Sequence, residues 1–157
     1  MTETDQVAIW LALGVLRSGD RDIEASTLEA IVEDAGSMSL DTALERNTVS
    51  TRSAGAFGME IAGSVLIPVL VSAAREFWAA YQKKIVEKLA ASAADATFAQ
   101  AKRWLGAAST DEARAMSDGL AAAIRKVGAE RGMAPADLDA LVAAMAAEKL
   151  KPALMAS

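Results

Sequence analysis

The side chains that most often carry catalysis are scarce in this sequence of 157 residues. It contains no His and no Cys, which excludes Cys/His zinc sites, thiol nucleophiles and every Ser-His or Cys-His catalytic pair. Asp, Glu and Lys can act as acids, bases or nucleophiles without His. The adjacent acids Glu33-Asp34 and Asp111-Glu112, however, lie at expected helix ends, where acids are common. We therefore expect no enzymatic activity, no metal site and no cofactor.

Charge is distributed unevenly along the chain, whose net charge is −5. Residues 1–50 carry ten acidic and three basic side chains, whereas residues 51–105 carry four and seven. An acidic head and a basic middle can attract one another within one copy or between copies. Residues 47–55 are rich in Ser, Thr and Asn, as a linker would be. We expect an acidic helical head, 1–50, joined to a helical core, 51–157, unless the whole chain is one domain.

The composition predicts an all-α fold with five to six helices. Hydrophobic residues make up 53% of the chain but aromatic residues only 4%, and much of the apolar content is Ala, the strongest helix former. A first helix is expected to follow an N-cap at Asp5. The pattern Ser26-Thr27-Leu28-Glu29 matches a capping box and predicts the start of a second helix, which Gly36 would end. A shorter helical turn is expected at 40–46.

The middle of the chain predicts one long amphipathic helix. After Pro68 the helical pattern continues to Leu105, unless it breaks within residues 92–95, and Gly106 would close it. A C-terminal helical hairpin should follow. Its first helix would begin with the capping box Ser109-Thr110-Asp111-Glu112, and its second with Pro135 in the first turn.

The long helix carries an apolar stripe at steps of three and four residues, the spacing that suits a partner helix. Aromatic side chains contribute a large share of the energy at protein interfaces. We therefore expect a non-catalytic interaction module that forms homo-oligomers or docks onto a larger partner by helix–helix association. The expected contact residues are Phe77, Trp78, Tyr81, Ile85 and Leu89.

The segment 54–74 supports an alternative function, because about twenty apolar residues are what a helix needs to cross a bilayer. In that interpretation the protein is membrane-active and inserts this segment as an anchor or pore-forming helix. The residues that would matter most are Gly58, Glu60, Gly63, Leu66 and Pro68. A carboxylate at such depth would have to face a pore, a cavity or a cation. The competing soluble interpretation is a Gly-rich loop leading into a buried core helix with Pro68 in its first turn.

Other ligand classes find little support in the sequence. The glycines of the 54–74 segment match neither a phosphate-binding loop nor a dinucleotide-binding fingerprint. The chain is acidic and has no basic cluster longer than two residues, so nucleic acid is not an expected partner. No small-molecule substrate is identified. The acidic N-terminus lacks the basic start of a signal peptide. A cytoplasmic location is expected, with the inner membrane as the location if the alternative function holds.

Overall fold

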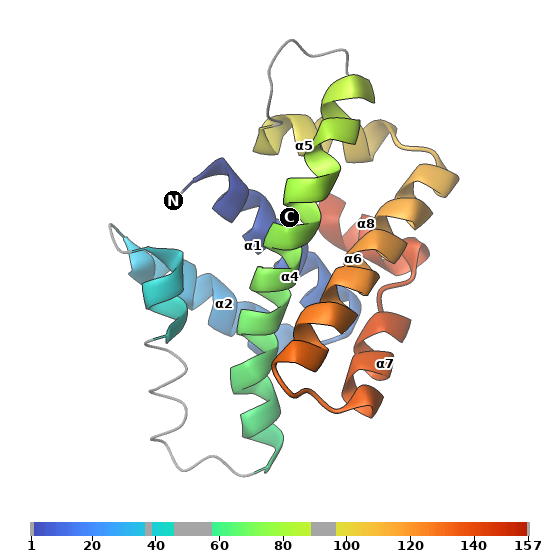
Figure 1. Cartoon of the computed structure of the whole chain (residues 1–157). Coiled ribbons are helices and arrows are strands. Elements are labelled where there is room, and N and C mark those ends of the chain that lie inside the picture. Colours follow the sequence, from blue (N-terminus) through green and yellow to red (C-terminus); the bar gives the residue numbers. More distant parts are fainter. Residues whose placement is uncertain (1, 37–38, 46–57, 89–96, 157) are drawn as a thin grey trace.

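The computed structural model describes residues 2–36, 39–45, 58–88 and 97–156 (Figure 1). Helix is the only regular secondary structure in these ranges, which confirms the all-α prediction, although the helices are more numerous than expected. They are α1 (Glu3–Ser18), α2 (Asp22–Ala35), a short segment at residues 40–45, α4 (Gly58–Lys88), α5 (Phe98–Ala107), α6 (Thr110–Glu130), α7 (Pro135–Ala143) and α8 (Ala147–Met155).

The first two helices begin earlier than predicted. Thr2 is the N-cap of α1, and Asp5 is the third helical residue of a capping box in which each side chain accepts a hydrogen bond from the other's backbone N–H. The predicted capping box at Ser26 is wrong, because α2 already starts after Arg21 and Ser26 lies inside it. A pattern of Ser followed three residues later by Glu also occurs in the middle of helices, so this pattern alone does not locate a helix start.

The single long helix predicted to run to Leu105 is also wrong, since the chain forms α4 and α5 separately. Thr97 is the N-cap of α5 and forms a full capping box with Gln100, so α5 has its own beginning. The predicted break at 92–95 lies outside the described residues. Pro68 does not start a helix, because α4 begins at Gly58, a full ten residues earlier, and holds Pro68 in its interior.

The C-terminal third contains three helices where a hairpin of two was predicted. The capping box Ser109-Glu112 is confirmed as the start of α6, and Pro135 is the first residue of α7. The last helix is split, however, since α7 ends at Ala143 and α8 begins at Ala147. The split turns α8 away from α7, and α8 packs mainly against α1.

Helix α4 is the centre of the fold. It packs mainly against α1 and α6 and also contacts α5. Figure 1 shows α4 in green through the middle of the molecule, with α2 on one side and α6 on the other. Buried apolar side chains from Val7 to Leu44 and from Leu66 to Leu154 form one continuous cluster. One core therefore joins residues on both sides of the predicted boundary at 47–55, a segment that lies entirely outside the described ranges.

Helix α8 is held on α1 by a close backbone approach. A methyl group added at Gly14 of α1 would lie 2.3 Å from Cδ2 of Leu154, so only glycine fits beneath this side chain. Leu154 is fully buried, and its carbonyl oxygen accepts a hydrogen bond of 3.0 Å from Nε1 of Trp10. The C-terminal helix is thus anchored by one apolar side chain and one buried hydrogen bond.

Candidate functional site

The predicted interaction stripe faces the interior of its own chain. Phe77, Trp78 and Ile85 are buried, with 7%, 2% and 2% of their surface exposed, and Tyr81 is half-buried. Leu89 lies outside the described residues. The helices of the same chain that pack on α4 include α1, α5 and α6. The three buried side chains are therefore not available, in this structure, for contact with a second protein.

An aromatic cluster shows how the stripe is covered. Phe77 and Tyr81 are stacked with ring centroids 4.8 Å apart, and the Tyr81 ring meets Trp104 of α5 edge-on at 5.5 Å. Phe77 also lies directly against α6, where a methyl group at Gly119 would be 3.0 Å from its Cε2. Burial raises the pKa of the Tyr81 hydroxyl, and the nearby Glu112 carboxylate raises it further. The cluster is packed as a core and leaves its tyrosine protonated at neutral pH.

The residues singled out for membrane insertion belong to the first half of α4. Gly58, Glu60 and Gly63 lie within the helix, and their side-chain environment is outside the described part of the structure. Leu66 is buried in the protein core and Pro68 is half-buried. Among the described residues, no helix is both long enough and apolar enough to cross a membrane.

The polar side chains of the described ranges make contacts that stabilise the fold. No group of three or more acidic residues gathers as a metal site would require within these ranges. The one polar side chain buried there, Ser117 of α6, donates a hydrogen bond to the carbonyl oxygen of Met145, just before α8. Every other buried polar side-chain atom in the described part has a hydrogen-bond partner as well.

A surface groove lies between α8 and the corner that joins α5 to α6. Its volume is about 380 Å³, within the usual range of ligand pockets. Met155, one of its lining residues, is an exposed large apolar side chain with 49% of its surface free. We call this concavity the α8 groove; its lining residues are Ala108, Thr110, Ala113, Glu148, Lys151, Pro152 and Met155.

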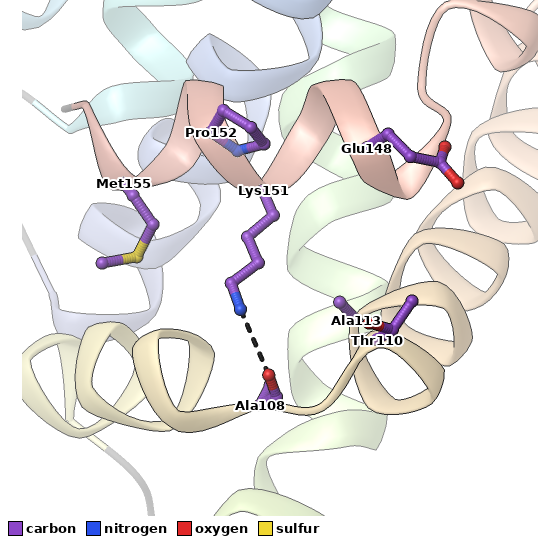
Figure 2. Close-up of a pocket in the computed structure, with 7 residues that line it drawn as sticks. All are labelled: Ala108, Thr110, Ala113, Glu148, Lys151, Pro152 and Met155. Atoms are coloured by element: carbon purple, nitrogen blue, oxygen red, sulfur yellow. Dashed lines mark hydrogen bonds between the residues drawn. The ribbon is translucent and has the colours of Figure 1, made fainter.

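Lys151 crosses the α8 groove. Figure 2 shows its side chain extending from α8 to the corner, where Nζ donates a hydrogen bond of 3.1 Å to the carbonyl oxygen of Ala108. An ammonium group has three donors, so two remain for a ligand or water. The N-terminus of α6, at Thr110, adds the positive end of a helix dipole. Glu148 lies toward one end of the groove and Met155 toward the other (Figure 2).

Sequence reasoning did not find the α8 groove. Its residues come from the end of α5, the start of α6 and one face of α8, about forty positions apart. Each is unremarkable in its local context, because Thr110 follows an N-cap and Lys151 reads as a cation near a helix end. Only the exposed Met155 could have been noticed as an apolar residue near the chain end.

Comparison of the chain with protein-family models, with curated proteins and with solved structures found no match. The function proposed below is therefore argued from the residues and the geometry alone.

The described residues contain one charged network with shifted pKa values. Arg75 of α4 donates from Nη2 to Asp5 of α1 at 2.8 Å and from Nη1 to Asp41 at 2.6 Å. Burial alone would raise the pKa of Asp5, but hydrogen bonds from the Thr2 backbone and from Arg75, together with the charge of Arg75, lower it overall. Burial would also lower the pKa of Arg75, and its two carboxylate partners raise it overall. The network joins α4 to α1 and to the 40–45 segment.

The network predicts a specific pH dependence of stability. Because the pKa of Asp5 is lower in the folded state than in the unfolded chain, its contribution is complete above about pH 4 and is lost as the pH falls through the folded pKa. Arg75→Gln should therefore reduce the free energy of unfolding most at neutral pH, by about 1–2 kcal/mol. Urea unfolding from neutral pH down to about pH 2.5 should show the difference from wild type shrinking.

A matched control is Arg125→Gln, which breaks an ion pair with Asp139 whose two side chains are both largely exposed. Exposed pairs contribute little, so this variant should follow wild type at every pH. A loss of stability by Arg75→Gln that stays constant down to the lowest pH would contradict the assigned role of Asp5.

Proposed function

We propose that this protein is a non-catalytic helical assembly module of the cytoplasm, which binds a protein surface in the α8 groove by helix–helix contact. The observation that carries the proposal is the groove itself, an apolar hollow beside the exposed Met155. Apolar surface that a folded protein leaves exposed next to a concavity is typical of interaction sites. Lys151 and the start of α6 supply polar groups that can orient a bound segment.

The burial of the predicted contact residues favours the α8 groove over the apolar stripe of α4 as the binding surface. Phe77, Trp78 and Ile85 already bury their surface within the chain, so a partner would have to unfold part of the core to reach them. The chemistry of the side chains supports a non-catalytic role. The chain has no His or Cys, and the lowered pKa of Asp5 is explained by hydrogen bonds from the Thr2 backbone and from Arg75 together with the charge of Arg75.

Site-specific photo-crosslinking in the cells that make the protein tests the proposal. A photoreactive benzoyl-phenylalanine replaces Thr110 in the groove or, as the control, Ala122 on the exposed face of α6. We expect covalent adducts with a polypeptide from position 110 and not from position 122. The adducts should disappear when Met155→Asp is added, because a charge on the groove wall disfavours an apolar occupant.

Two results would contradict the proposal. The first is a yield of protein adducts from position 110 no higher than from position 122. The second is a chain that remains in the membrane fraction after alkaline carbonate extraction, which would favour insertion of the 54–74 segment instead.

A further inference from the structure

Two large apolar side chains are exposed in the described part of the chain, and they lie on different surfaces. Met155 lines the α8 groove, whereas Ile23 projects from the first turn of α2 with 82% of its surface free. We propose that the groove's partner is a second copy of this chain, whose Ile23 inserts into the α8 groove. This inference rests on the proposed function and names the partner of the same site.

The size and chemistry of the two surfaces are complementary. Ile23 is a single branched apolar side chain on an exposed turn, and the α8 groove has an apolar wall formed by Ala113, Pro152 and Met155. With about 380 Å³ of space, the groove can take an isoleucine side chain together with parts of its neighbours. Burying an exposed isoleucine and the free part of Met155 in one step removes both exposed apolar side chains from water.

The charges around Ile23 suit those of the groove. Ile23 is flanked by Asp22 and Glu24 in the first turn of α2, and Lys151 has two donors left after its bond to Ala108. The groove also carries Glu148, which would repel an acidic turn. In Figure 2 its carboxylate points away from Lys151. Glu24 is already paired with Arg21 at 3.3 Å within the chain, so Asp22 is the acid that faces Lys151 in the proposed contact.

The two surfaces allow two kinds of assembly. Ile23 and the α8 groove are separate surfaces, so every copy offers one of each. A single contact between Ile23 and a groove leaves a free groove on one copy and a free Ile23 on the other. Two copies can make both contacts in a two-fold dimer, or further copies can add head-to-tail.

Analytical ultracentrifugation of the purified full-length protein tests the inference. One apolar side chain and its neighbours form a small interface, so the concentration series should extend from about 10 µM to about 1 mM. The average mass of the wild type should rise with concentration above that of the monomer. Ile23→Asp, which removes the inserted group, and Thr110→Trp, which fills the groove, should each weaken association at least about tenfold.

Mixing these two variants gives the decisive measurement. Ile23→Asp still has an open groove, and Thr110→Trp still has Ile23, so an equimolar mixture should form a 1:1 dimer and nothing larger. Both positions are exposed, so the variants should keep the helical circular dichroism of the wild type. Ala122→Asp on the outer face of α6 adds the same charge elsewhere and should associate like the wild type.

A wild type that remains monomeric at about 1 mM, or a mixture of the two variants that forms no dimer, would overturn the inference. Association that survives Ile23→Asp would overturn it as well. If crosslinks from position 110 capture a different protein while the purified chain stays monomeric, the inference fails and the proposed function stands. If position 110 captures nothing, both fail.

Discussion

Leu154→Ala is expected to lower the free energy of unfolding by about 2–5 kcal/mol, although it lies only three residues from the C-terminus. Chain ends usually tolerate change, but Leu154 is fully buried in the contact between α8 and α1. Truncating it removes apolar contacts and leaves a cavity beside Gly14. For a chain of this length each kcal/mol corresponds to about 2–4 °C in the melting temperature. Urea and thermal unfolding, followed by circular dichroism, measure both quantities.

The close approach of Leu154 to Gly14 adds a second expected result. The effect of Gly14→Ala on the free energy of unfolding should change sign when Leu154 is replaced by alanine. In the wild type, Gly14→Ala places a methyl group 2.3 Å from Cδ2 of Leu154, and overpacking of this kind costs about 1–3 kcal/mol. Alanine is better than glycine inside a helix by about 1 kcal/mol, which offsets part of the cost. In the Leu154→Ala background the clash is gone, and Gly14→Ala should stabilise the protein.

The four variants form a double-mutant cycle whose coupling energy reports the contact directly. Gly14→Ala that has the same effect in both backgrounds would mean that α8 does not pack on α1 at this point. A loss of less than about 1 kcal/mol for Leu154→Ala would lead to the same conclusion. Since α8 forms one wall of the α8 groove, either result would also remove the structural basis of the proposed function.

Features that depend on neighbouring residues were predictable from the sequence. The capping box at Ser109 and the helix start at Pro135 were located correctly because each depends on hydrogen bonds or sterics within one turn. Gly36 was expected to end a helix, and it ends α2 with a φ of 51°, in the region where glycine is favoured. In these places local chemistry and the overall fold agree.

Features that depend on packing were not predictable. Pro68 removes a hydrogen bond from the middle of α4, and yet the helix continues because Leu66, Ile67 and Val69 around it are buried in the core. The split between α7 and α8 at residues 144–146 has no glycine or proline to announce it. It is accounted for by contacts far away in sequence, since Ser117 binds the Met145 carbonyl and Trp10 binds that of Leu154.

The candidate site was even less predictable from the sequence, because it depends on packing between distant segments. A period of three and four residues identified the apolar face of α4, but periodicity cannot tell whether that face is covered by a partner or by the chain itself. The covering residues, Gly119 and Trp104, come from α6 and α5, and nothing local links them to α4. The α8 groove arises from the same long-range packing, as the space that α8 leaves between itself and the α5–α6 corner.

Trp78→Ala tests whether Trp78 is a core residue or a contact residue. We expect this substitution to lower the free energy of unfolding more than any of the others. Trp78 has only 2% of its surface exposed, and removing a buried tryptophan side chain costs about 3–5 kcal/mol. The variant should melt far below the wild type or fail to fold. Lys83→Ala, on an exposed part of the same helix, should change stability by no more than about 0.5 kcal/mol. A Trp78→Ala variant that melts like the wild type but no longer associates would show that Trp78 is an interface residue. It would also contradict the proposal that the α8 groove is the binding surface.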